Sequence, residues 1–147
     1  MIEGKPVILV AEDNENDVVL LQRAFGAAGI VSSRHYVSDG QEAVEFLRGD
    51  GRFADRAAFP MPDLLLLDLK MPRMNGFEVI QWVRAQSFLE HLRIVVLTTS
   101  SDIADIERAY QLGAHSFLTK PANLDDFKNM IASVYRYWKA FGLTPKS

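Results

Sequence analysis

Four consecutive leucines lie between two acids in the stretch Asp63-Leu-Leu-Leu-Leu-Asp68-Leu-Lys-Met-Pro-Arg-Met-Asn-Gly76. The run is too short for an ordinary helix and has no polar alternation, which is typical of a parallel strand buried on both faces. Pro72 and Gly76 then indicate a loop, and residues 77–84 have helical spacing. Asp68 is therefore expected at the carboxyl end of a central strand, where open α/β sheets bind ligands.

Other apolar runs end in polar residues in the same way. They predict strands over residues 6–11, 93–98 and 115–120, with a weaker candidate over 31–37. Segments of helical spacing separate the strands, and in the helix expected over 102–112 Ile103, Ile106 and Ala109 should face inward. This alternation predicts an α/β fold with a parallel sheet, right-handed crossovers and helices on both faces.

The size of the chain predicts one domain. At 147 residues and 48% hydrophobic content, it is long enough for a single core and too short for two ordinary domains. We expect one domain over residues 1–147, with its core at about 5–140. Residues 48–62 lack periodicity and should form a long loop that Phe53, Phe59 and Met61 attach to the body.

Charge and residue usage exclude several classes of protein. The formal net charge of −3 gives no electrostatic reason to expect direct nucleic acid binding. The absence of cysteine excludes disulfides and thiolate metal sites, and the three histidines show no ligand pairing. The sequence also contains neither a signal-peptide pattern nor an apolar run of transmembrane length, so we expect a soluble cytoplasmic protein without membrane contact.

Charged and hydroxyl side chains follow the predicted strands. Their carboxyl ends carry Glu12 with Asp13, Asp68, Thr98 and Lys120, which a parallel sheet would bring to one edge. Three neighbouring carboxylates repel one another unless a cation compensates them. Because the set contains oxygen ligands and no histidine or cysteine, it favours Mg²⁺ over zinc.

A phosphoryl group is a second ligand that this set of side chains fits. An aspartate carboxylate such as Asp68 can accept a phosphoryl group covalently. Magnesium and the Lys120 ammonium could neutralise the charge that develops on the phosphoryl oxygens, while the Thr98 hydroxyl donates to one of them. No general base is needed, because the carboxylate is already ionised.

Four motifs now identify a resemblance. In their order and spacing, they resemble the receiver domains of two-component response regulators over residues 5 to 140 or so: Glu12-Asp-Asn14, Leu66-Leu-Asp-Leu-Lys-Met-Pro72, Leu97-Thr-Thr-Ser100 and Leu118-Thr-Lys-Pro121. The resemblance implies a flavodoxin-like (βα)5 doubly wound sheet with strand order 2-1-3-4-5. It also implies a phosphoprotein that switches partner binding in signalling, rather than an enzyme.

Site residues carry over position by position. Asp68 matches the aspartate that a sensor histidine kinase phosphorylates, and Glu12 and Asp13 match the acidic pair of the Mg²⁺ site, at which Mn²⁺ or Ca²⁺ can substitute. The Lys70 main-chain carbonyl falls where the family supplies a further metal ligand. Thr98 and Lys120 match the switch hydroxyl and the invariant lysine.

The family also implies two conformational features. Phe117 matches the aromatic side chain that rotates inward when the threonine moves to the phosphoryl group. The Lys120–Pro121 peptide bond is commonly cis in the family.

Within the family, three features are most similar to the single-domain regulators that serve bacterial and cyanobacterial phytochromes. These features are the long loop, Asn14 and the aromatic tail around residues 135–138. The expected partner is accordingly a sensor histidine kinase such as a bacteriophytochrome, although the same subgroup includes regulators paired with other sensor kinases.

The last predicted helix has an apolar stripe that continues almost to residue 141. A helix over 123–140 would span roughly 27 Å, longer than the strands that it covers. One hypothesis is a homodimer through this helix and its neighbouring strand and helix, with Tyr135 and Trp138 as anchors. The alternative is that the tail folds back on its own domain.

Two other functions compete with phosphoryl-accepting signalling. An aspartyl-phosphate hydrolase of the haloacid-dehalogenase type also has a nucleophilic aspartate after a buried strand, but it requires a second aspartate where this chain has Lys70. The other alternative is a phosphorylation-independent interaction scaffold with the receiver fold. The presence of every pocket residue argues against such a degenerate site.

Overall fold

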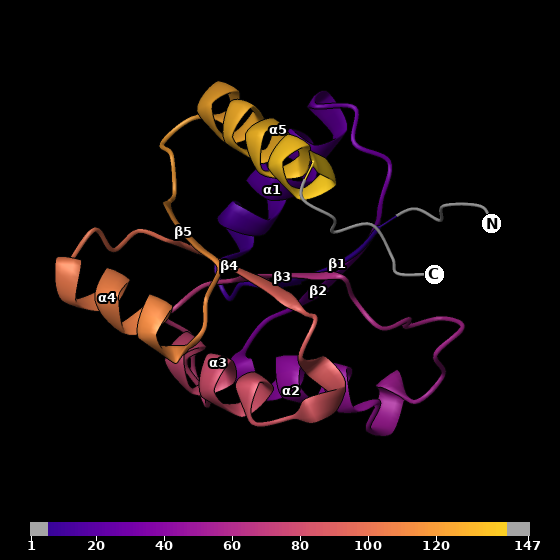
Figure 1. The fold of residues 1–147 in the computed structure, drawn as a ribbon. Helices are drawn as coiled ribbons and strands as arrows, with labels where there is room; N and C mark the ends of the chain where they lie inside the picture. The colour runs from indigo at the N-terminus through magenta and orange to yellow at the C-terminus, as the bar shows by residue number, and fades with distance from the viewer. Residues whose placement is uncertain (1–5, 141–147) are drawn as a thin grey trace.

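Five parallel strands form the centre of the structure, and helices cover both faces of the sheet (Figure 1). This computed structural model describes residues 6–140, and side chains as far as residue 137. In chain order, the elements are β1 (Val7–Ala11), α1 (Glu15–Ala27), β2 (Ser33–Val37), α2 (Gly40–Arg48), η1 (Gly51–Phe53), β3 (Leu64–Leu67), α3 (Gly76–Arg84), η2 (Ser87–Leu89), β4 (Arg93–Thr98), α4 (Ile103–Leu112), β5 (Ser116–Thr119) and α5 (Leu124–Ala140).

The strand order is β2-β1-β3-β4-β5, and each neighbouring pair is parallel. This confirms the predicted flavodoxin-like topology, with β3 at the centre between β1 and β4. Because every strand runs in the same direction, the residues that follow β1, β3 and β5 share one edge with the end of β4.

The leucine run of β3 contributes to both cores. Leu64 and Leu66 pack on the side covered by α1 and α5, whereas Leu65 and Leu67 pack on the side of α2, α3 and α4 (Figure 1). All four leucines are buried, with exposed fractions of 2% or less. Side chains alternate between the two faces of a strand, so a strand covered on both faces requires an uninterrupted apolar run.

Most helix ends carry the residues that satisfy their free backbone groups. Asn75 and Glu78 form a capping box at the start of α3, and Asp39 accepts from the Glu42 N–H at the start of α2. At the C-terminal end of α4, Gly113 adopts a left-handed conformation with φ 117°. These local signals explain why the helices begin and end close to where the sequence predicts.

The long loop before β3 is fixed to the body of the protein. The Arg56 guanidinium donates to the carbonyls of Phe46, Leu47 and Phe59 at 2.8 to 3.0 Å, which caps the end of α2. Phe53 is buried and its ring lies 5.3 Å from that of Phe59. The prediction that aromatic residues attach this loop is thus confirmed. Met61, in contrast, is 40% exposed and does not serve this purpose.

Two other expectations are wrong. Ile103 is 71% exposed, because it is the first residue of α4 and lies one turn before the point where Ile106 and buried Ala109 meet the body of the protein. The Lys120–Pro121 bond is not cis, since residues 6–140 contain no cis peptide bond. The Lys120 side chain nevertheless reaches the carboxylates at the sheet edge.

The helix α5 packs against α1 through its first half, where Phe127 and Ile131 are buried. Tyr135 is partly buried against the same core. The side chain of Trp138 and all of Phe141 lie outside the described residues, so the proposed Trp138 anchor has no described contact. Across the described part of the chain, no helix combines the length and apolar character needed to cross a membrane.

A neutral histidine, His115, lies at the amino-terminal end of β5 and contacts both β4 and α3. His115 Nδ1 lies 3.2 Å from the Ile94 amide and 3.2 Å from the Arg84 guanidinium, so this nitrogen must accept and the proton resides on Nε2. Arg84 also donates to the Gly113 and Leu92 carbonyls. Burial, together with the charges of Arg84 and Arg93, lowers the pKa of His115 to about 4.

This shift predicts how stability depends on pH. Both states hold a neutral His115 above pH about 6.5, the ordinary pKa of the unfolded residue. Between pH about 6.5 and 4 only the unfolded chain takes up the proton, so the free energy of unfolding should fall through that window. Urea denaturation at several pH values should show a weaker fall for His115→Gln. His91→Gln, which alters an exposed ring, should follow the wild type, and equal slopes for all three proteins would contradict the assignment.

Candidate functional site

The polar residues predicted to meet at the carboxyl edge of the sheet do so. Backbone hydrogen bonds continue one residue past the strands: the Asp68 N–H donates to the Ala11 carbonyl at 3.0 Å, and the Lys120 N–H donates to the Thr98 carbonyl at 2.7 Å. These bonds fix the backbone from which the functional side chains project. Glu12 is held likewise, by its N–H and the Val37 carbonyl.

Three acids at this edge form a group of oxygen ligands. Glu12, Asp13 and Asp68 each offer a carboxylate oxygen, and these oxygens lie within 4.8 Å of one another. Glu12 and Asp68 are buried, whereas Asp13 is exposed. Such a set fits a hard divalent cation that keeps some of its waters. The Lys70 peptide lies close by, with its N–H 3.4 Å from Asp68 Oδ1.

Lys120 provides the positive charge of the site. Its Nζ lies 2.7 Å from Glu12 Oε1, 2.7 Å from Asp17 Oδ2 and 3.2 Å from Asp68 Oδ2. The lysine side chain is only 6% exposed, so these contacts replace the water that the ammonium loses. Asp68 and Lys120 therefore lie close together, as the sequence predicts.

Burial and charge shift two pKa values in this cluster. Burial of Glu12 raises its pKa to about 7, although the hydrogen bond from Lys120 opposes the shift. Burial alone would lower the pKa of Lys120, but hydrogen bonds to Asp17 and Glu12 and the charge of Asp68 outweigh it and raise the pKa. The lysine therefore stays charged beside the acids.

Thr98 and Phe117 lie on the β4 and β5 side of the site. Thr98 is fully buried, and its hydroxyl lies 3.4 Å from the Ser100 N–H, which donates to it. Phe117 is half-buried against the core on the α4 side, and its N–H donates to the Tyr110 hydroxyl at 3.1 Å. Thr98 therefore lies at the end of β4 on the same edge as Asp68, and Phe117 lies one strand further along the sheet.

Asp17 is the site residue that the sequence reasoning missed. It occupies the first turn of α1, where an acid is common because it complements the helix dipole. One signal was available: Asp17 is four residues before buried Leu21 and seven before buried Ala24, so it belongs to the inward stripe of its helix. An acid on that stripe, next to the strand ends, must have a polar partner inside.

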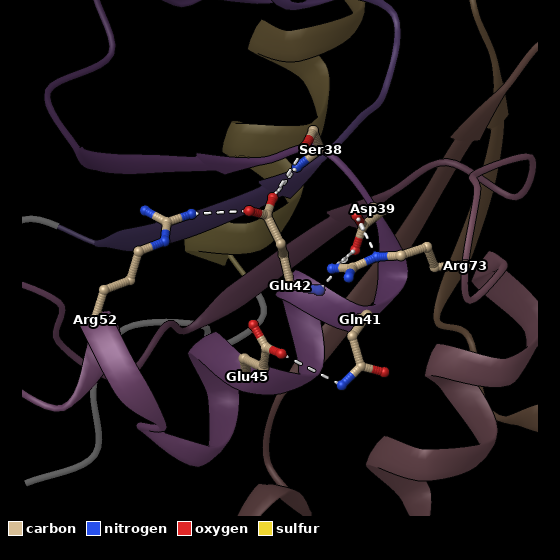
Figure 2. A network of polar contacts seen from close by, with 7 residues as sticks. All are labelled: Ser38, Asp39, Gln41, Glu42, Glu45, Arg52 and Arg73. Atoms are coloured by element: carbon tan, nitrogen blue, oxygen red, sulfur yellow. Dashed lines mark hydrogen bonds and ion pairs between the residues drawn. The ribbon is translucent and has the colours of Figure 1, made fainter.

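The loop after Asp68 is anchored to the start of α2 (Figure 2). The Arg73 guanidinium makes two contacts with the Asp39 carboxylate, at 3.0 and 3.2 Å, while Asp39 caps α2. Burial would raise the pKa of Asp39, but the hydrogen bonds from Arg73 and the Glu42 amide outweigh it and lower the pKa. Arg73, the residue that pairs with Asp39, has φ 65°, which is unusual for a residue other than glycine.

A second set of contacts in Figure 2 stabilises the same end of α2. Glu42 accepts from the Ser38 N–H and hydroxyl and pairs with Arg52 at 3.0 Å. Arg52 belongs to η1, so this pair connects the long loop to α2. The loop that follows Asp68 therefore contacts the start of α2, and hydrogen bonds and an ion pair stabilise that helix end in turn.

The family model for the response regulator receiver domain matches residues 8–132 of this chain. The chain belongs to the response regulator receiver family. One relative, the probable methanogenesis regulatory protein FilR2 of Methanothrix harundinacea, is 33% identical over 142 residues, covering 95% of this chain and 87% of FilR2. Response regulator Rcp1 of Synechocystis is 33% identical over 132 residues, covering 90% of this chain and 88% of Rcp1.

Solved structures give the same family. The response regulator RPA3017 in red light signaling of R. palustris has a TM-score of 0.90 and 37% identity, covering 97% of this chain and 99% of that one. The phosphorylated cyanobacterial phytochrome response regulator RcpA has a TM-score of 0.87 and 31% identity, with coverage of 97% and 100%. The Mn²⁺-bound form of Rcp1 has a TM-score of 0.84 and 32% identity, with coverage of 96% and 99%. This receiver domain is thus related to phytochrome response regulators.

The anchored loop leads to a prediction about Gly40. A Cβ at this position would overlap the backbone of Met74, so Gly40→Ala should push the loop that follows Asp68 away from α2. We expect a loss of about 1–3 kcal/mol in the free energy of unfolding, the usual effect of overpacking. Gly26→Ala is the matched control, because its added Cβ meets open space within α1 and should stabilise by about 0.5–1 kcal/mol. Urea denaturation measures both, and an equal effect of the two substitutions would contradict the packing argument.

Proposed function

We propose that Asp68 is the phosphoacceptor of this response regulator and that a sensor histidine kinase is its donor. The observation that supports the proposal is the buried Asp68 carboxylate, which contacts Lys120 and faces the ligand oxygens of Glu12 and Asp13. An Asp68 oxygen would attack the phosphorus of a phosphohistidine. The O–P bond forms as the P–N bond breaks, and the imidazole nitrogen leaves with the bonding electron pair.

The neighbouring residues have distinct roles in this transfer. The Lys120 ammonium neutralises charge on the phosphoryl oxygens, and the Thr98 hydroxyl donates to one of them after moving toward the group. Glu12, Asp13, Asp68 and the Lys70 carbonyl would hold Mg²⁺, with Mn²⁺ or Ca²⁺ as substitutes. When bound, the ion supplies further positive charge to the phosphoryl oxygens.

Phosphorylation would then change the surface that partners bind. Movement of Thr98 vacates space beside β5, and Phe117, which is only half-buried in the structure, can rotate inward to fill it. A partner that binds this state more tightly shifts the population toward it in proportion to its difference in affinity. In this proposal the protein acts as a signalling switch in the cytoplasm and does not bind nucleic acid directly.

The donor kinase that we propose is a bacteriophytochrome. RPA3017 and RcpA support this pairing, because the first is described in red light signaling and the second as a phytochrome response regulator. FilR2, which has the same 33% identity to this chain as Rcp1, is named for a different process, the regulation of methanogenesis. Phosphotransfer from purified histidine kinases of the same genome would identify the donor.

Substitution of Asp68 tests the acceptor directly. Incubation with Mg²⁺ and a small phosphodonor should add one phosphoryl group to the wild type and none to Asp68→Asn, which has no free carboxylate at that position. Asp63→Asn is the matched control, since it changes the same residue type at the opposite end of β3. Intact-protein mass spectrometry measures the label. Label retained on Asp68→Asn would assign another acceptor, and an unlabelled wild type would favour the scaffold alternative.

We also propose a homodimer through α5 and the neighbouring β5 and α4. Supporting this, α5 extends to Ala140, and α4 exposes Ile103 and 47% of Tyr110. Tyr135 already packs partly on its own domain, so Trp138 is the better candidate for an anchor across the interface.

Sedimentation velocity tests this interface. The wild type should dimerise with rising concentration and Trp138→Ala should remain a monomer, because truncation of an interface tryptophan commonly costs about 2 kcal/mol or more. Phe88→Ala is the control, because Phe88 is an exposed aromatic on η2. If both the wild type and Trp138→Ala are monomers, the dimer hypothesis is wrong.

A further inference from the structure

We propose that Asp17 is a positioning residue that holds the Lys120 ammonium in the resting state and gives it up to the phosphoryl group. The inference depends on Asp68 as the phosphoacceptor. It adds a carboxylate from α1 to the switch, outside the strand-end residues from which the acceptor site is built.

The three contacts of Lys120 are unequal. The two shortest, of 2.7 Å each, are with Glu12 and Asp17, whereas the contact with Asp68 is 3.2 Å. The ammonium therefore lies nearer to the β1 and α1 side of the site than to the acceptor. A group added to Asp68 has to draw the ammonium away from that side.

An ammonium has only three N–H donors, and three carboxylates already surround this one. A phosphoryl group adds anionic acceptor oxygens, so a bond to one of them competes with a bond that exists in the resting state. Lys120 can strengthen its contact with the acceptor only by lengthening or losing a contact on the β1 and α1 side.

Exposure indicates which contact is exchanged. The Asp17 side chain is 21% exposed, compared with 2% for Glu12 and 7% for Asp68. Water can therefore solvate a released Asp17 carboxylate, while a released Glu12 would be left buried and unpaired. Asp17 also lies in the first turn of α1, where the helix dipole favours a negative charge without help from lysine.

The side chain of Asp17 can be changed without loss of the helix cap. Its backbone N–H donates to Asn14 Oδ1 at 3.1 Å, and this bond does not involve the carboxylate. Asp17→Asn keeps the shape and removes the charge. Glu15→Gln is a matched control, because Glu15 is the other acid in the same turn and has no ion pair with Lys120 in the described part of the chain.

The test is the affinity for beryllofluoride, a phosphoryl mimic, measured by calorimetry at saturating Mg²⁺. Relative to the wild type, Asp17→Asn should lower the Kd about 3- to 10-fold, the effect expected for removing one competing hydrogen bond of ordinary net strength at a partly solvated carboxylate. Glu15→Gln should stay within about 2-fold, since an exposed charge without a direct contact is screened. Asp17→Glu, which restores a carboxylate, should return the Kd toward the wild-type value.

The possible outcomes are distinct. An unchanged or raised Kd for Asp17→Asn overturns the inference alone, as does an equal drop for Glu15→Gln, which would indicate a general charge effect. Asp17→Ser provides a second neutral side chain and should shift the Kd in the same direction as Asp17→Asn, and thermal unfolding verifies that each variant is folded. A wild type that fails to bind beryllofluoride overturns both the inference and the assignment of Asp68.

Discussion

The structure depends on one buried ammonium shared by carboxylates from three different segments. Lys120 ties the end of β5 to the ends of β1 and β3 and to the first turn of α1. Without it, two buried acids would face each other across a few ångströms of protein. The cost of burying Glu12, Asp68 and Lys120 is offset by their contacts with one another, so these three groups act as a unit, whereas Asp17 is partly solvated.

The surrounding fold keeps this unit in place from two sides. The sheet continues its hydrogen bonds one residue beyond the strands and so fixes the backbone of Glu12, Asp68 and Lys120. The loop after Asp68 rests on α2 through the pair of Asp39 and Arg73 (Figure 2). By contrast, the hydrogen bond described for the Thr98 hydroxyl within residues 6–140 is a long one of 3.4 Å, from the Ser100 N–H, and Phe117 is half-buried. The acceptor side of the site is therefore held by more polar contacts than the side toward β5.

The sequence predicts most of the fold for a physical reason. Strands covered on both faces need unbroken apolar runs, and their ends must become polar where they meet solvent, so both the strands and the edge of the site can be located from residue types. The order of the strands came instead from the family resemblance. Periodicity also gave a helix over residues 102–112, but it could not show where along that helix the contact with the body begins. For this reason the prediction that Ile103 faces inward is wrong.

Asp17 shows a second limit of sequence reasoning. An acid in the first turn of a helix has an ordinary explanation in the helix dipole, and its contact with a lysine 103 residues away depends on how α1 packs beside the end of β5. The relatives include a phosphorylated and a metal-bound member of the family. The separate role that we propose for Asp17 comes instead from the contacts of Lys120 in this chain.

A crystal structure of the protein with Mg²⁺ and beryllofluoride tests the central claim most directly. The account predicts beryllium bonded to an Asp68 carboxylate oxygen, with the Lys120 ammonium and the Thr98 hydroxyl on its fluorides and the metal ion held by the acids at the same edge. Beryllofluoride bound to another residue, or Lys120 turned away from it, would contradict the account.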